Sequence, residues 1–292
     1  MNMEAFMLEP QTSLPECVRR LTIRLRRRIR AAALLAVACS FLAPAAAVAQ
    51  EDEEEENRGW LITVGPGAQL TPEYPGADSL GFGPMPVFGF RREGTPLPFE
   101  APDEGWGFGI LGDDSAFNFG PAVQFQSKRQ EEDVGAPVGD VGFTVEAGAF
   151  VEVFPMRNFR IRAEGRQGIG GHEGMIGDLS ADFVIRDRDT YVFSIGPRAR
   201  FSDSDYQRAY FGVTPAVAAA TGLEAFDPDG GLHAVGIMSG LTYMLGNNWG
   251  VYGYAGYDRL VRDAADSPIV REYGSRGQFS GGLGFFFTFT TG

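Results

Sequence analysis

Apolar and polar residues alternate along most of the chain after residue 58, in segments of about ten residues. In the last such segment, one face carries Phe279, Gly281, Leu283, Phe285, Phe287 and Phe289, and the other carries Gln278, Ser280, Gly282, Gly284, Phe286 and Thr288. Successive side chains of a β-strand point to opposite faces of the sheet. One face can therefore meet lipid while the other meets a lumen, which is typical of a transmembrane β-barrel.

Eleven further segments favour strands, many of them by the same alternation: 59–70, 80–91, 104–111, 116–126, 142–154, 159–169, 177–186, 191–201, 206–217, 231–245 and 248–262. With the last segment, they predict an all-β fold, a transmembrane antiparallel β-barrel of the bacterial outer membrane with twelve strands. Ten strands is the alternative, because Gly and Pro interrupt 80–91 and 104–111. We expect acidic loops at 92–103, 127–141 and 262–275 to connect neighbouring strands.

Charged residues gather on the predicted inner face of three neighbouring strands. They are Arg160, Arg162, Glu164 and Arg166 on the first, Asp178 and Asp182 on the second, and Arg198 and Arg200 on the third. Neighbouring strands lie about 4.8 Å apart, so charges of opposite sign can pair across them. We interpret this lumen cluster as a structural ladder that fills a narrow barrel; the alternative is a charged constriction that admits small anionic solutes.

The first 49 residues have the pattern of a secretory signal peptide. Seven arginines between residues 19 and 30 precede an apolar stretch from Ala31 to Val48, and Ala47-Val48-Ala49 supplies the small residues of a cleavage site. The acidic run 51–56 follows directly, and a block of like charges repels itself. We therefore expect a cleaved signal peptide at 1–49, an acidic disordered leader at 50–58, and a barrel from 59 to 292.

The charge and cysteine content narrow the function classes. Removal of residues 1–49 takes away 7 of 25 basic and 3 of 38 acidic residues, so the net charge falls from −13 to −17. A chain this acidic has no electrostatic basis for binding nucleic acid. Both cysteines, Cys17 and Cys39, are removed as well, which excludes disulfides, thiolate metal ligands and a cysteine nucleophile from the exported part.

Residues for catalysis or metal binding are few. His172 lies in a glycine-rich turn, and His233 is expected on an inner face. Ser180 and Ser239 are the candidate inward-facing nucleophiles, but no Gly-x-Ser-x-Gly elbow surrounds either. The sequence therefore predicts no enzyme, no metal site and no cofactor.

Short motifs along the chain resemble those of the MipA/OmpV family of outer-membrane proteins. The segment 71–78 resembles the family's early Pro-x-Tyr-x-Gly-Ser/Ala-Asp motif through Pro72, Tyr74, Gly76 and Asp78. Further matches in the C-terminal half are Gly212, Val213, Gly222, Leu223, Trp249, Ser267 and Pro268. The resemblance runs from about residue 59 to 289.

This resemblance implies a scaffold in the outer membrane of a Gram-negative cell. It implies that the protein links murein (peptidoglycan) hydrolases and synthases to that membrane, with a lytic transglycosylase and a murein synthase as partners and membrane lipid around the barrel. The family has no established catalytic residues to transfer. A small-solute channel or passive transporter is the alternative function, because of the charged lumen.

Overall fold

A computed structural model describes residues 59–112 and 115–291. The predicted signal peptide and the acidic leader lie outside the described residues. The strands are β1 (Trp60–Gly65), β2 (Gly67–Pro72), β3 (Leu80–Pro84), β4 (Val87–Arg92), β5 (Trp106–Gly107), β6 (Phe117–Gln126), β7 (Thr144–Met156), β8 (Phe159–Gly170), β9 (Met175–Asp187), β10 (Tyr191–Ser202), β11 (Gly231–Met244), β12 (Trp249–Leu260) and β13 (Gly277–Thr291).

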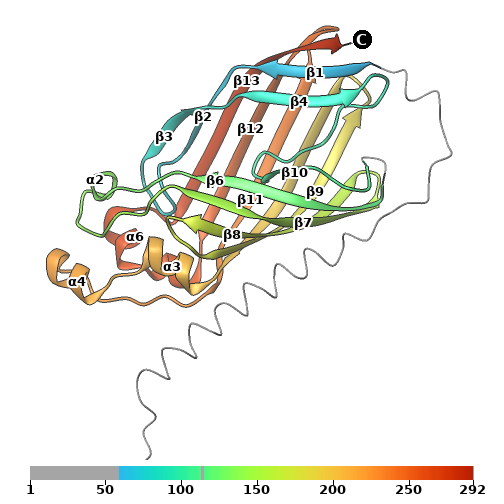
Figure 1. The fold of residues 1–292 in the computed structure, drawn as a ribbon. Helices are drawn as coiled ribbons and strands as arrows, with labels where there is room; N and C mark the ends of the chain where they lie inside the picture. The colour runs from blue at the N-terminus through green and yellow to red at the C-terminus, as the bar shows by residue number, and fades with distance from the viewer. Residues whose placement is uncertain (1–58, 113–114, 292) are drawn as a thin grey trace, which may run out of the picture. The chain divides into compact units, whose positions relative to one another are not determined.

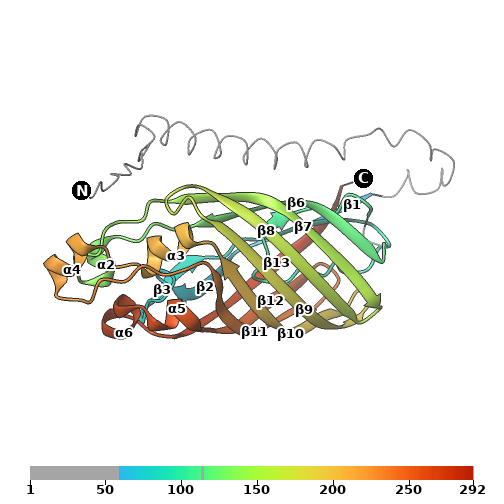
Figure 2. The ribbon, with the colours of Figure 1, turned by 90° about the horizontal axis from the view of Figure 1, so that it is seen from below.

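All these strands belong to one antiparallel sheet that curls into a barrel (Figures 1 and 2). Each strand from β5 to β12 pairs with the next one along the chain, and β1 pairs with both β13 and β4. The first strand along the chain, β1, therefore lies beside the last, β13. The structure confirms the predicted all-β antiparallel barrel fold.

The alternation of β13 matches its two environments. Phe279, Leu283, Phe285 and Phe287 are 50–58% exposed on the outer surface, whereas Phe286 and Thr288 are buried on the inner face. Aromatic side chains this exposed are costly in water but favourable against acyl chains. The outer face of β13 therefore carries the apolar surface that is typical of a transmembrane barrel strand.

Two of the predicted strands are bent in the middle. Segment 59–70 becomes β1 and β2 on either side of Pro66, and segment 80–91 becomes β3 and β4 on either side of Met85-Pro86. Proline has no N–H to donate to a ladder, so it interrupts regular pairing. Segment 104–111 retains only the two-residue strand β5, which pairs with β6.

A seam without strand pairing lies between β4 and β5 in the described part of the chain. Ten antiparallel pairings lead around the sheet from β4 to β5, and each pairing reverses the strand direction. Because ten is an even number, β4 and β5 run in the same direction. Parallel neighbours require a crossover connection rather than a hairpin. Here that connection is the segment 93–105, which enters the lumen, as described below.

Prolines protect one edge of this seam. Met85 N and Glu93 N donate to Gly67 O and Gly59 O at 2.9 Å, away from the seam. Because backbone groups alternate in direction along a strand, the even-numbered positions face the seam, and two of these are Pro84 and Pro86. Proline at such positions is a common way to discourage strand addition at an edge.

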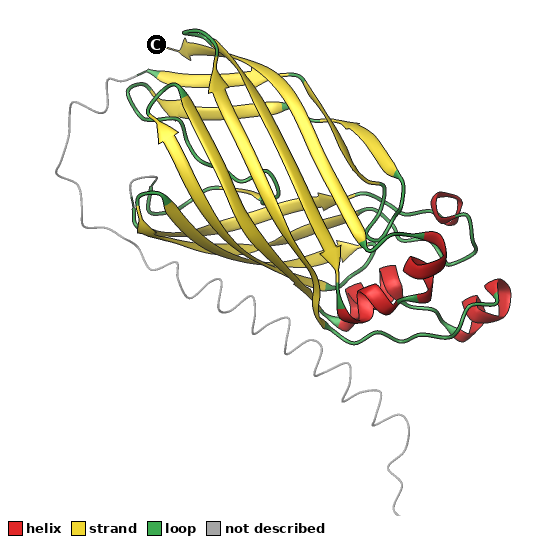
Figure 3. Ribbon diagram, turned by 180° about the vertical axis from the view of Figure 1, so that it is seen from behind, coloured by secondary structure: helices red, strands yellow, loops and turns green. Residues whose placement is uncertain are grey.

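The barrel has two different ends. At one end, which we call the short-turn end, β7–β8, β9–β10 and β11–β12 are joined by residues 157–158, 188–190 and 245–248. The pairing of Trp60 with Thr291 places both ends of the sheet's chain there. At the opposite, helical end lie α2 (Glu131–Val134), α3 (Ser204–Phe211), α4 (Pro215–Thr221), α5 (Arg262–Asp266) and α6 (Pro268–Tyr273) (Figure 3).

The expected strand over 206–217 is wrong, because these residues form α3 and the start of α4. The Asp203 side chain accepts hydrogen bonds from Asp205 N at 3.1 Å and Tyr206 N at 3.0 Å, which is the geometry of a helix N-cap. Tyr206 and Tyr210 then meet on one helix face, with ring centroids 4.9 Å apart. No helix in residues 59–112 or 115–291 is long and apolar enough to cross a membrane.

Candidate functional site

The lumen cluster lies on the inner faces of β8, β9 and β10, and its side chains contact one another. In the sheet register Arg160 faces Asp182, Glu164 faces Asp178, and Arg200 faces Asp178 from the other side. Strands β7 and β12 add three carboxylates that are not in the predicted cluster, although the alternation of 142–154 already puts the first two on its polar face: Glu146, Glu152 and Asp258. All three lie on inner faces, so the period-two pattern would have located them.

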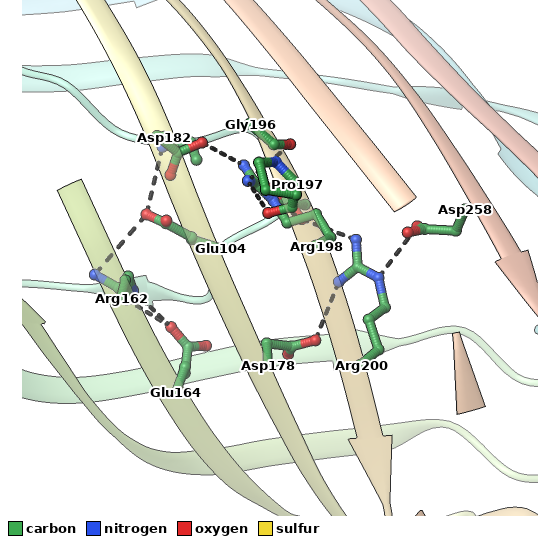
Figure 4. Close-up of polar contacts among 12 residues, drawn as sticks. Glu104, Arg162, Glu164, Asp178, Asp182, Gly196, Pro197, Arg198, Arg200 and Asp258 are labelled. Carbon is green, nitrogen blue, oxygen red and sulfur yellow. Dashed lines mark hydrogen bonds and ion pairs between the residues drawn. The ribbon is translucent and has the colours of Figure 1, made fainter. Parts of the chain in front are cut away.

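The wall residues form a continuous ion-pair network, and Figure 4 draws part of it together with Glu104. Arg166 binds Glu146 at 2.9 Å, Asp178 at 2.8 Å, and Glu164. Arg200 binds both Asp178 and Asp258 at 3.1 Å. A network of this kind satisfies charges that would be costly to bury alone.

Asp182 connects two arginines across the network. Arg160 and Arg198 both reach it at 2.9 Å, one to each carboxylate oxygen. The Asp182 side chain is fully buried. Its charge is therefore balanced entirely within the barrel wall.

The segment 93–105, which we call the plug, runs from β4 into the lumen and returns to β5. The sequence predicts a connecting loop at 92–103, and nothing in its pattern indicates this path through the lumen. Leu97 packs against Val184 and Val192 on the opposite wall, and its N–H donates to Arg188 O at 3.0 Å. Near the other end of the plug, Gly105 N donates to Glu164 at 3.2 Å. The plug therefore crosses the barrel interior.

Glycine makes room for the plug at one point of the wall. A Cβ added at Gly240 of β11 would lie 3.1 Å from Cγ of Pro102. A larger residue there would push against the plug. Glycine at position 240 thus lets the Pro102 ring approach β11 closely, and a side chain there would have to displace that ring by a few tenths of an ångström.

Two adjacent plug residues complete the lumen cluster. Arg160 binds Glu104 with both terminal nitrogens, and Arg162 lies 3.8 Å from the same carboxylate. Asp103 accepts from Arg198 Nε at 2.9 Å and Arg200 at 2.8 Å. The plug is thus held to the wall by four arginines.

Little free volume remains in this part of the lumen. The cavity enclosed by Asp103, Glu104, Arg162, Glu164 and their neighbours measures about 10 Å³. One water molecule needs roughly that volume. A larger cavity of about 510 Å³ opens at the short-turn end and is lined by Leu61, Arg91, Glu93, Gly94, Asp189, Thr190, Met244, Leu245, Gly246 and Asn247.

Most of the motif residues build the helical end rather than the lumen cluster. Tyr74 is buried there with Val213, and Gly76 (φ 96°) donates its N–H to Gln278 at 2.9 Å. Ser267 donates to Phe211 O at 2.8 Å, and Pro268 begins α6. Gly222 ends α4 in a left-handed conformation. The remaining motif residues are Pro72 at the end of β2, exposed Asp78, Gly212 after α3, partly buried Leu223, and Trp249, which begins β12 at the short-turn end.

A buried arginine fixes this end of the barrel. Arg129 is 2% exposed and donates to Tyr210 O and Gly139 O, both at 3.0 Å. Its guanidinium also lies 5.9 Å from the Tyr74 ring centroid and 5.7 Å from that of Tyr210. Burial lowers the pKa of this guanidinium. Arg129 thus ties the 127–141 connection to α3 and to the first motif.

The histidines and serines singled out from the sequence do not meet. His172 is buried, and both of its ring nitrogens have partners. Its Nδ1 accepts a hydrogen bond from Gly174 N at 3.0 Å, and its Nε2 lies 3.2 Å from the Glu146 carboxylate. Ser180 is buried on the inner face, whereas the prediction for Ser239 is wrong: it shares the outer face of β11 with Ile237 and Leu241.

A serine–histidine contact does occur elsewhere, between Ser202 Oγ and His233 Nδ1 at 3.0 Å. In the described part of the chain, no carboxylate contacts the other ring nitrogen of His233, so the orienting acid of a catalytic triad is missing. Among the same residues, no group of His, Cys, Asp and Glu is arranged to hold a metal ion.

Solved structures similar to this chain are outer-membrane β-barrels. The NanC porin shares 10% identity with a TM-score of 0.33, covering 78% of this chain and 98% of the porin. A Pseudomonas aeruginosa FadL homologue shares 8% identity with a TM-score of 0.31, covering 80% and 89% of the two chains. The N-terminal barrel domain of Pseudomonas aeruginosa OprF shares 13% identity with a TM-score of 0.24, covering 60% and 98%. Similarities this low carry no argument about function.

No curated protein matches the chain. A family model does match, over residues 64–289, and it is described as MltA-interacting protein MipA. The match covers β2 to β12, most of β13, and all the helices of the described part. It also includes every motif residue from Pro72 to Pro268. The chain, an outer-membrane type of β-barrel, therefore belongs to the MipA family.

Proposed function

We propose that this protein is a scaffold in the Gram-negative outer membrane that binds a murein-degrading lytic transglycosylase and, through it, a murein synthase. The family match carries the proposal, because the family is described by its interaction with MltA. The filled lumen supports a binding role over free passage of solutes, since the cavity within the lumen cluster measures only about 10 Å³.

The two ends of the barrel suggest where such partners bind. Outer-membrane barrels carry short turns on the periplasmic side and longer loops outside. The short-turn end would then face the periplasm, where murein enzymes work. It also contains the 510 Å³ cavity, which we call the mouth. We therefore infer that the mouth and its surrounding turns receive the partner.

The mouth offers a charged rim for this contact. Arg91 binds Asp189 at 3.2 Å, and the Asp189 side chain is 66% exposed. Glu93 is exposed nearby, and Leu61 and Leu245 supply apolar surface. A hydrophobic centre with a polar rim is the usual composition of a protein interface.

Reversing the charge of the rim is expected to weaken partner binding. Since the exposed Glu93 and Asp189 make the rim acidic, we infer that the partner presents basic groups to it. A Glu93→Arg/Asp189→Arg variant should then retain less than about a tenth of the lytic transglycosylase captured by the wild type, because like charges across an interface cost several kcal/mol. Capture of purified transglycosylase by detergent-solubilised protein measures this.

The matched control is Glu132→Arg/Glu224→Arg, which makes the same charge change at exposed positions of the helical end. It should bind as the wild type does. Equal loss in both variants would point to nonspecific electrostatics, and wild-type protein that captures no murein enzyme would refute the scaffold function.

A further inference from the structure

The two plug carboxylates occupy their arginines as a ligand would. Glu104 takes both terminal nitrogens of Arg160, which is the forked geometry by which arginine recognises a carboxylate. Asp103 Oδ2 lies between Arg198 Nε at 2.9 Å and Arg200 at 2.8 Å. Both carboxylates are nearly buried, with side chains 12–13% exposed.

The plug is joined to the wall differently from the way strands are joined to each other. Between Thr95 and Glu104, the described structure gives the plug two backbone hydrogen bonds to the wall: Thr95 N to Arg92 O, where the plug leaves β4, and Leu97 N to Arg188 O in the turn between β9 and β10. Its other contacts involve side chains: Leu97 packs against Val184 and Val192, Phe99 lies under the guanidinium of Arg160, and Asp103 and Glu104 form ion pairs. Ion pairs of this kind can be replaced by another anion, whereas a strand ladder cannot.

We propose that Arg160, Arg162, Arg198 and Arg200 form a binding site for a small dicarboxylate, and that the plug occupies this site with Asp103 and Glu104 of the same chain. A dicarboxylate that enters the lumen takes the places of these two side chains, and the plug withdraws from the arginines. The proposal does not depend on transglycosylase binding.

The donor geometry, rather than net charge, selects the ligand. Without the plug, the wall network contains five arginines, namely Arg160, Arg162, Arg166, Arg198 and Arg200. They face six carboxylates: Glu146, Glu152, Glu164, Asp178, Asp182 and Asp258. This wall has no excess of positive charge to attract anions in general. It does present the forked N–H pair of Arg160 and the shared position between Arg198 and Arg200, which fit two neighbouring carboxylates.

The mouth provides the route to this site. Its lining includes Glu93 and Gly94, the first residues of the plug, and Arg91, which donates to Thr95 O. A solute that enters the mouth therefore meets the base of the plug directly. We infer entry from the short-turn end.

A disulfide between plug and wall makes the proposal testable. Cysteines at Pro102 and Gly240 would lie close together: a Cβ at Gly240 is 3.1 Å from Pro102 Cγ, which is bonded to Pro102 Cβ. The two Cβ atoms therefore lie near the separation of about 3.5–4.5 Å that a disulfide needs. The part of the chain after residue 49 contains no other cysteine. When reduced P102C/G240C protein is mixed with a fixed concentration of oxidised glutathione, which accepts the two electrons, saturating succinate should slow disulfide formation by about tenfold. This is the factor by which loss of one charge-assisted hydrogen bond lowers the fraction of plug on the wall.

Succinamide, the uncharged analogue, should leave the rate of disulfide formation unchanged. Equal rates with and without succinate would overturn the proposal, and so would equal slowing by succinamide. This measurement keeps Asp103 and Glu104 intact, so it does not depend on whether a variant without them folds.

A second variant examines transport. D103N/E104Q in liposomes should take up succinate at least about tenfold faster than the wild type, by the same reasoning. The matched control D205N/D227N removes two charges at the helical end and should behave as the wild type. Adding P102C/G240C under oxidising conditions should abolish the uptake, and reductant should restore it. Uptake that is equal for succinate and succinamide, or unaffected by the disulfide, contradicts the assigned site.

Discussion

Arg160→Ala is expected to lower the free energy of unfolding by about 3–5 kcal/mol, the usual cost of removing one partner from a buried ion-pair network. Arg160 is 1% exposed and pairs with Glu104, Glu152 and Asp182. Its removal leaves three carboxylates close together without their shared cation. Urea unfolding in detergent micelles, followed by tryptophan fluorescence, measures the change.

The control for this prediction is an arginine with an exposed partner. Arg208 binds Asp205, and the two side chains are 46% and 49% exposed. Arg208→Ala should therefore cost about 0–1 kcal/mol. Arg160→Lys keeps the positive charge but loses the pair of terminal nitrogens that binds Glu104. Its cost in unfolding free energy should therefore lie between those of Arg160→Ala and Arg208→Ala. If Arg160→Ala and Arg208→Ala unfold alike, the lumen network does not stabilise the barrel.

Phe285→Arg is expected to cost about 2–4 kcal/mol, the penalty for arginine near the midplane of a barrel's lipid-facing surface. Phe285 lies near the middle of β13, is 55% exposed, and points outward with Leu283 and Phe287. Unfolding from lipid vesicles, followed by the gel shift between heated and unheated samples, measures this.

The same substitution nearer the end of β13, and so nearer the membrane surface, provides the comparison with Phe285→Arg. Phe289 lies near the end of β13, where it pairs with Ile62. Phe289→Arg should cost only about 0–1 kcal/mol, because the penalty falls near the interface. Equal costs at the two positions would show that this face does not cross the hydrocarbon layer.

The sequence was sufficient for the barrel because period-two alternation follows directly from strand geometry. It failed at 206–217, where Tyr206, Arg208 and Tyr210 mimic a strand. The residue that indicates a helix there is the N-cap Asp203, whose side chain accepts hydrogen bonds from two backbone N–H groups. Ser239 was assigned to the wrong face, although its odd-numbered neighbours Ile237 and Leu241 are apolar and outward.

The plug was not predictable by these means. Glu104 contacts a residue 56 positions away, and Asp103 contacts one 95 positions away, so no local pattern records either pairing. Pro96, Pro98 and Pro102 remove regular secondary structure from the segment, which then resembles an ordinary acidic loop. The alternation along each strand places the arginines on the inner face. Their partners Asp103 and Glu104 lie in a segment without periodicity, so the pattern does not locate them.

The most direct test of the central claim, that the outer face of this sheet contacts lipid, is a cysteine scan of β13. Single cysteines from 279 to 287 would carry a fluorophore, with nitroxide-labelled acyl chains in the bilayer as quencher. The structure predicts strong quenching at 279, 283, 285 and 287 and weak quenching at 280, 282 and 286. Quenching without this alternation, or equally weak at every position, would contradict it.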